Sequence, residues 1–293
     1  MQLVAQLEEA VFGVLCHAFG PDGSEEAFEE GVNCLAMFAA FGSRSGVSQR
    51  LWSLVPTMVE LIVASLGSPV EEVGSCFEFK EPIGAALQSL IQNDPQGFTS
   101  LVFEDGTTPI QVTWHYVTKI MQIETNEIGR MCAPSVLVCM IENLRGQIDA
   151  FLPGMLEMAQ TQFQEAKTKE YKLFLSQLIA ACFYYNAELS MAILEQQQGT
   201  AFVFSHWLKV VPLYRQRFEL RRSILAFLAI AALPEGALPE MVRLGLPDIL
   251  KHAGEMVVHS AELRKRAEKR ASEAGSKSAA SGTGKSEEEE VIP

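Results

Sequence analysis

Basic side chains are scarce in the first third of the sequence, and this scarcity argues against one class of partner. Residues 1–110 contain 15 Asp and Glu but only 3 Lys and Arg, and the whole chain of 293 residues has a formal net charge of −13. A protein of this charge repels phosphate backbones. The composition therefore disfavours direct binding to nucleic acid and favours a basic protein as the partner of the acidic first third.

The sequence also lacks a long apolar run and clustered cysteines. Its longest uncharged apolar stretch near the end, residues 223–233, is too short for a bilayer, which needs about 20 apolar residues. Glu8 and Glu9 interrupt the N-terminal segment, which has no basic residues and so is atypical of a secretory signal. The six cysteines are scattered and form no C-x-x-C pair, as is typical of reduced thiols. We therefore expect a cytosolic or nuclear protein with no membrane insertion; the family resemblance described below implies both the nucleus and the cytoplasm.

No pattern of catalytic or metal-ligating residues stands out. The motifs H-E-x-x-H and G-x-S-x-G are both absent, and His252 and His259 are too far apart on one helix to bind the same ion. Residues 282–286 (GTGKS) resemble part of a phosphate-binding loop, but the strand and helix that should flank such a loop are missing. The sequence thus predicts no enzyme, no cofactor and no metal site.

Apolar residues recur at steps of three and four along most of the chain, beginning with residues 3–18, which predicts helices. Ser24 and Ser48 are expected N-caps of the second and third helices, and Pro56 should kink the third. Further helices are expected at about 81–92, 109–123, 125–144, 147–165, 167–186, 187–197, 200–213, 216–233 and 237–268. No run has the strict two-residue alternation of a strand. The predicted fold class is all-α.

Helices of this length with short connectors favour stacked antiparallel pairs. The pair 125–144 and 147–165 occupies about 41 residues, within the period of HEAT-type repeats. Each unit of such a solenoid buries its apolar face against its neighbours. We expect a HEAT-like α-solenoid over residues 1–268. Because apolar periodicity ends near residue 270, we expect a disordered tail over residues 269–293.

Paired carboxylates are the candidate protein-binding residues. The pairs lie in the acidic first third and comprise Glu25, Glu26, Glu29, Glu30, Glu71 and Glu72. A solvated helix face is the simplest interpretation of such pairs. The alternative is an acidic surface for a basic partner, where opposite charge speeds encounter and selects the partner more than it adds affinity.

Two other features also have two interpretations. The basic run RKRAEKR at residues 264–270 closes the last predicted helix, where the helix dipole favours positive charge. Contact with an acidic partner or a nuclear import signal is the alternative. Trp52, Trp114 and Trp207 each lie among apolar neighbours at helical spacing. They are either core residues or parts of a pocket on the concave face.

Three stretches follow one another in an order that goes beyond composition. They are residues 51–56 (LWSLVP), residues 179–186 (IAACFYYN), and Trp207-Leu208 followed by residues 218–233 (FELRRSILAFLAIAAL). In this order they resemble the C-terminal part of the importin-β (karyopherin-β) family, and most of all its importin seven/eight type. Asn186 is expected in the left-handed position that ends the helix before it.

The resemblance implies a non-enzymatic HEAT solenoid that carries basic cargo proteins through nuclear pores. Nuclear pore proteins and the GTPase Ran are partners implied by the resemblance alone, and the family's Ran-binding N-terminal region is not matched here. We therefore expect the cargo-side, C-terminal portion of a nuclear import receptor. The alternative is an α-solenoid scaffold or regulatory subunit with no transport role.

Overall fold

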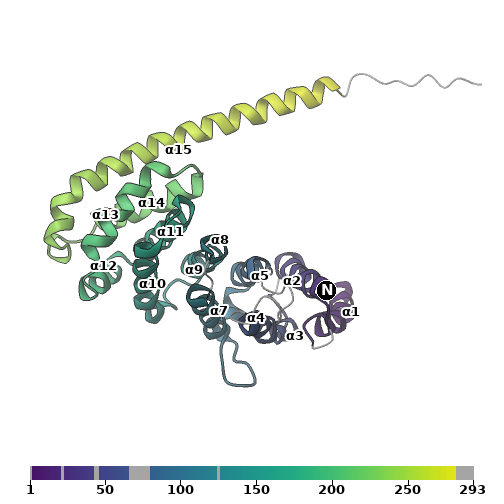
Figure 1. The fold of residues 1–293 in the computed structure, drawn as a ribbon. Helices are drawn as coiled ribbons and strands as arrows, with labels where there is room; N and C mark the ends of the chain where they lie inside the picture. The colour runs from purple at the N-terminus through teal and green to yellow at the C-terminus, as the bar shows by residue number, and fades with distance from the viewer. Residues whose placement is uncertain (1, 21–22, 43–45, 66–79, 124–125, 282–293) are drawn as a thin grey trace, which may run out of the picture.

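The computed structural model describes residues 2–20, 23–42, 46–65, 80–123 and 126–281, and all regular structure within these ranges is helical (Figure 1). The first half comprises α1 (Gln2–Ala18), α2 (Glu25–Met37), a π-helical turn (Phe38–Gly42), α3 (Gln49–Trp52), α4 (Leu54–Ser65), α5 (Lys80–Asn93), α6 (Pro95–Ser100), α7 (Pro109–Ile123), α8 (Glu127–Arg130) and α9 (Cys132–Asn143). The second half comprises a 3₁₀ turn (Asp149–Phe151), α10 (Leu152–Glu165), α11 (Lys169–Tyr185), α12 (Ala187–Gln196), α13 (Thr200–Val210), a 3₁₀ turn (Val211–Leu213), α14 (Arg217–Ala231), a 3₁₀ turn (Glu235–Ala237) and α15 (Glu240–Ser281).

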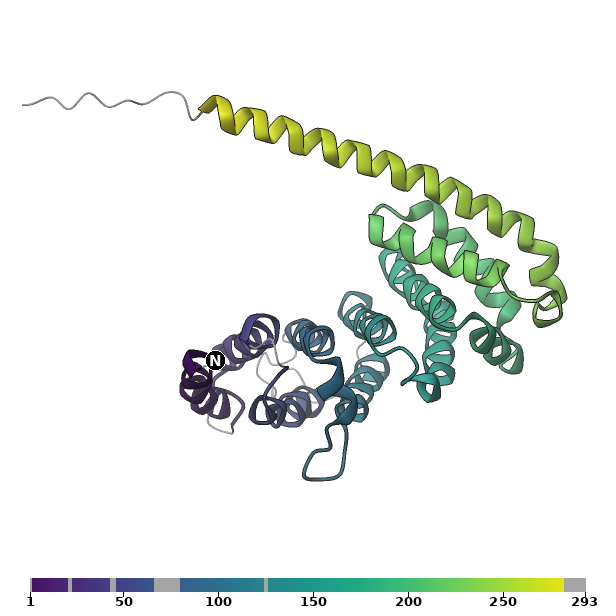
Figure 2. The same ribbon diagram turned by 180° about the vertical axis from the view of Figure 1, so that it is seen from behind.

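The helices form two rows that bend together into a curved ribbon (Figures 1 and 2). In one row α2 contacts α5, α5 contacts α9, α9 contacts α11, α11 contacts α14, and α14 contacts α15. In the other row α4 contacts α7, and α10 contacts α12 and α13. Figure 1 shows the first row on the inner side of the bend. The predicted all-α solenoid is confirmed, because each helix packs chiefly against neighbours in its own and the adjacent units.

The helix pairs have a different register from the one predicted. The sequence pairs residues 125–144 with residues 147–165, but α9 packs against α7, and α10 packs against α11. The connection after α9 contains Gly146, with a left-handed φ of 77°, and the 3₁₀ turn Asp149–Phe151. This connection leads from one helical pair to the next, while only residues 166–168 join α10 to α11.

Local signals set most helix boundaries. The hydroxyl of Ser24 accepts a hydrogen bond from the backbone N–H of Ala27 at 3.2 Å, and that of Ser48 accepts one from Leu51 at 3.3 Å, so both predicted N-caps are confirmed. Pro56 cannot donate to the carbonyl four residues earlier. The predicted third helix is accordingly divided at Ser53 into α3 and α4.

Pro134 has the same effect on the predicted helix 125–144. This helix is divided at Met131 into α8 and α9, three residues before the proline. The first of these pieces is tied to the next unit, because the carboxylate of Glu127 accepts backbone N–H bonds from Lys167 at 2.6 Å and from Thr168 at 2.7 Å, just before α11. Glu127 therefore links two units at the bend.

Trp52 and Trp207 belong to the core, and Trp114 is partly buried against it. Trp52 and Trp207 are 1% and 0% exposed, and Trp114 packs against Phe151 with ring centroids 5.5 Å apart. Close packing is also evident at Gly154, where an added Cβ would lie 2.8 Å from the Trp114 ring. Core packing is therefore the correct interpretation of these residues.

Asn186 corrects a sequence-based expectation. Its φ of −154° is extended, so it does not take the left-handed position predicted for the end of α11. Its side-chain oxygen instead accepts a hydrogen bond from the backbone N–H of Leu189 at 3.1 Å. Asn186 thus starts α12 as an N-cap, because a short amide side chain can satisfy a free N–H of the first turn.

The last helix continues further than predicted. Residues 269–281 extend α15, although the sequence analysis assigned them to a disordered tail. The ion pairs Arg264–Glu268 (2.7 Å) and Arg266–Glu262 (3.7 Å), both at a spacing of four residues, support the exposed part of the helix. Disorder of the remaining tail, residues 282–293, stays a prediction because these residues lie outside the described ranges.

Candidate protein-binding surfaces

The acidic candidates of α2 lie together on the surface. The side chains of Glu26, Glu29 and Glu30 are all exposed, and their spacing of three and four residues places them on one face of the helix. The side chain of Glu25, which belongs to the first turn, lies outside the described set, as do Glu71 and Glu72. The structure thus brings three of the six candidates together.

One of the few bases of this region is already paired. Arg50 forms an ion pair with Glu9 and lies 5.7 Å from the centre of the Phe12 ring. It therefore bridges α3 and α1 and does not neutralise the acidic face of α2. Burial and, to a smaller extent, the nearby carboxylate of Glu30 raise the pKa of the Cys34 thiol.

A second candidate surface, not predicted from the sequence, is a groove between α5, α9, α11 and α14 on the inner row. Its hollow has a volume of about 310 Å³. Its lining combines apolar and amide side chains, among them Gln88, Pro134, Val138, Leu173, Phe174, Gln177 and Phe218. Phe174 and Phe218 are 38% and 59% exposed, so aromatic surface is available to a ligand.

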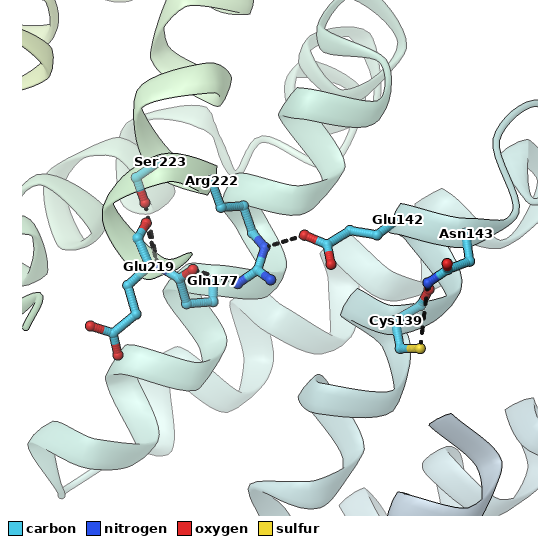
Figure 3. Close-up of polar contacts among 7 residues, drawn as sticks. All are labelled: Cys139, Glu142, Asn143, Gln177, Glu219, Arg222 and Ser223. Atoms are coloured by element: carbon cyan, nitrogen blue, oxygen red, sulfur yellow. Dashed lines mark hydrogen bonds and ion pairs between the residues drawn. The ribbon is translucent and has the colours of Figure 1, made fainter. Parts of the chain in front are cut away.

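Arg222 of α14 holds the wall of this groove together. Its Nε donates to Glu142 Oε1 of α9 at 2.8 Å, and its Nη1 donates to Gln177 Oε1 of α11 at 2.6 Å. The amide nitrogen of Gln177 in turn donates to the hydroxyl of Ser223 at 3.3 Å. Because the Arg222 side chain is only 12% exposed, this network fixes three helices of the inner row relative to one another (Figure 3).

Glu219 also lines the groove, but its carboxylate serves α14 itself. Its Oε2 accepts backbone N–H bonds from Arg215 and Gln216, both at 2.8 Å, which completes a capping box at the start of the helix. Figure 3 shows this carboxylate directed away from Arg222. The negative charge of Glu219 is therefore committed to the helix end.

The groove does not offer a reactive thiol. Burial raises the pKa of Cys139 to about 12, so its sulfur is protonated at neutral pH and a weak nucleophile. Its Sγ lies 3.6 Å from both the carbonyl of Gln88 and the side-chain nitrogen of Asn143. In the part of the chain that the structure describes, no group of His, Cys, Asp and Glu has the arrangement of a metal site.

The sequence analysis missed the groove because its walls come from helices far apart in the chain. Glu142 and Arg222 are 80 positions apart, and Gln177 and Arg222 are 45 apart. The only local signal was the stretch FELRRSIL in residues 218–225, which contains Phe218 and Arg222. It contributed to the resemblance but did not indicate a surface.

Comparison with known proteins confirms the resemblance to the importin-β family. An importin beta-like SAD2 homolog from Arabidopsis thaliana is 22% identical over 268 residues, which cover 87% of this chain and 24% of that protein. A probable importin-7 homolog from Dictyostelium discoideum is 28% identical over 171 residues, covering 57% of this chain and 16% of that protein. The chain therefore spans a quarter or less of the length of these relatives.

No family model matches the sequence, and no solved structure matches it. Among the helices of the described ranges, none combines the length and apolar character needed to cross a bilayer.

Proposed function

We propose that this chain is a protein-binding helical-repeat portion of a nuclear import receptor and corresponds to its cargo-side, C-terminal part. The observation that carries the proposal is the similarity to two importin proteins along a chain that folds as a curved solenoid. Solenoids of this kind present extended surfaces that bind other proteins. The protein then moves between the cytoplasm and the nucleus and acts without catalysis or cofactor.

The proposed cargo is a basic protein that docks by charge. The exposed carboxylates of Glu26, Glu29 and Glu30 lie on one face of α2, in a region where acids outnumber bases by 15 to 3. Glu25, Glu71 and Glu72 are proposed to extend this surface. Such complementarity accelerates association and selects the partner, and it weakens as salt rises.

Binding of a histone or a ribosomal protein, measured by pull-down over a range of salt concentrations, tests the cargo surface. The charge reversal E26K/E29K/E30K should weaken binding strongly at low salt. The control E157K/E188K/E195K makes the same change in net charge at exposed positions on α10 and α12. Binding that is insensitive to salt, or that falls equally in both triple variants, would contradict docking on α2.

The transport role has its own test. A receptor portion should bind nuclear pore proteins and shuttle between nucleus and cytoplasm when fluorescently labelled. Binding to Ran, which the family resemblance suggests, is tested by adding the GTPase loaded with GTP. A chain that binds basic proteins yet neither binds pore proteins nor shuttles would be an α-solenoid scaffold or regulatory subunit instead.

A further inference from the structure

The inner-row groove belongs to a longer hollowed surface with Phe218 at its centre. Phe218 lines the hollow of about 310 Å³ described above and two adjoining hollows of about 360 Å³ each. One adjoining hollow includes Arg145 and Tyr184, and the other reaches Ser260 of α15. The surface therefore runs from α9 across α14 to the last helix.

Positive charge gathers along this surface although the whole chain is acidic. Four arginines (Arg145, Arg217, Arg221 and Arg222) and two glutamates (Glu142 and Glu219) line the three hollows, a local excess of two positive charges. Glu142 is paired with Arg222, and Glu219 caps α14. Neither glutamate is therefore left to neutralise the other three arginines.

Those three arginines are ready to accept an anionic partner. Within the described ranges, Arg145, Arg217 and Arg221 form no ion pair, and all three are exposed. The guanidinium of Arg145 is held 4.4 Å from the centre of the Tyr184 ring, which orients it without neutralising it. A planar guanidinium is well suited to bind carboxylate oxygens in a bidentate geometry.

We propose that this surface binds an acidic peptide segment of a partner protein. Its carboxylates pair with Arg145, Arg217 and Arg221, and a neighbouring aliphatic or aromatic side chain enters the hollow beside Phe174 and Phe218. A short acidic segment needs only the local positive charge. A nucleic acid, whose charge is denser, would meet stronger repulsion from a chain with a net charge of −13, and its backbone has no apolar group for the hollow.

This surface is independent of the proposed basic-cargo surface in both position and charge. The acidic carboxylates lie on α2, whereas Arg217 and Arg221 lie on α14 and Arg145 lies just after the end of α9. The two proposals can therefore fail separately. A histone pull-down reports on the first, and an acidic-peptide titration reports on the second.

Fluorescence anisotropy with the full chain tests the proposal. The probe is a short fluorescein-labelled peptide in which leucine and phenylalanine are flanked by glutamates, with the matched glutamine peptide as its control. The variant R217E/R221E should weaken binding of the glutamate peptide by roughly tenfold or more, because two attractions become repulsions. It should leave histone binding intact.

The matched variant K209E/K251E makes the same charge change at exposed positions that do not line the groove. It should leave peptide binding nearly unchanged, and an equal loss in both double variants would refute a specific site. The apolar contribution is tested by F218A against L228A, since both residues are exposed on α14. Only F218A should weaken binding, and equal effects would remove the hollow from the proposal.

Two further outcomes would overturn the proposal. Displacement of the probe by a short DNA duplex as effectively as by unlabelled peptide would indicate a general anion site. The variant E287Q/E288Q/E289Q/E290Q removes the carboxylates of the chain's own acidic tail. Peptide binding that occurs only in this variant would identify that tail, and not a partner protein, as the occupant.

Discussion

Asp94 joins three segments of the first half of the solenoid, and its removal should destabilise them together. Its Oδ2 accepts hydrogen bonds from the indole nitrogen of Trp52 at 2.9 Å and from the backbone N–H of Val47 at 3.1 Å. Its Oδ1 accepts the N–H of Gly97 at 2.9 Å and thereby caps α6. One carboxylate thus connects the entry to α3, the buried Trp52 and the start of α6.

The expected cost of D94A follows from these contacts. Loss of an N-cap costs about 1 kcal/mol. The indole N–H of Trp52, a residue that is 1% exposed, would lose its acceptor, which costs about 1–3 kcal/mol. The backbone N–H of Val47 is nearer the surface, so water can replace its partner. We expect D94A to destabilise this region by about 2–4 kcal/mol. D94N keeps only one of the two acceptor oxygens and turns its NH2 toward an N–H donor, so it should also be destabilising.

Gly97 offers an independent check on the same contact. Alanine is a better helix former than glycine by about 1 kcal/mol, so G97A would ordinarily stabilise α6. An added Cβ at Gly97 would, however, lie 2.1 Å from Asp94 Oδ2. The carboxylate must then move away from Trp52, and G97A should be destabilising.

Hydrogen exchange resolved by peptide is the appropriate measurement, because a solenoid can unfold locally. D94A and G97A should accelerate exchange in α3 and α6 and leave α11 and α14 unchanged. D248A, at an exposed position of α15, is the control and should leave α3 and α6 protected. Unchanged protection of α3 in D94A would refute this account of Asp94.

Three further predictions concern the second half of the solenoid. Burial opposes ionisation of Glu127, but hydrogen bonds from Thr168 and Lys167 outweigh it and lower its pKa. The contribution of Glu127 to stability is therefore present above about pH 4.3 and is lost as the pH falls through the lowered value. Urea unfolding of E127Q should show less acid dependence than that of the native chain, and identical acid dependence would contradict the link to α11. Y214F removes the acceptor of the Trp207 indole N–H (3.0 Å) in a fully buried site and should cost about 1–3 kcal/mol in thermal or urea unfolding, whereas an unchanged midpoint would contradict the role of this bond. The thiol of Cys139, with its pKa raised to about 12, should react with a thiol reagent at neutral pH far more slowly than exposed Cys16, and comparable rates in single-cysteine variants would argue against its burial.

Much of the fold could be predicted from the sequence because its signals are local. Ser24 and Ser48 cap helices through N–H groups three residues ahead, and the helix predicted at residues 109–123 has the bounds of α7. Apolar residues at steps of three and four define one buried face per helix, whatever that face packs against. Repeated faces of this kind already require a stack of helices.

Errors arose where a residue's role depends on a distant or following segment. Asparagine is a common residue at the end of a helix, yet the side chain of Asn186 caps the start of the next helix. The helix pairing was offset because the period of a repeat does not reveal which neighbours form the tighter pair. Apolar periodicity indicates a helix with a buried face, and an exposed helix has no such periodicity. The continuation of α15 to Ser281 was therefore missed.

The amino-acid sequence on its own determined the helices, most of their caps, the all-α solenoid class and the likeness to importins, because each depends on neighbours within a turn or on order along the chain. Only the tertiary structure decided that Asp94 holds Trp52, 42 positions away, and that Arg222 gathers Glu142 and Gln177 into one groove wall. Contacts between such distant residues depend on how successive helices stack, and small differences in the angle between packed helices accumulate along the solenoid. The surfaces that bind partners are therefore a property of the stacked row as a whole.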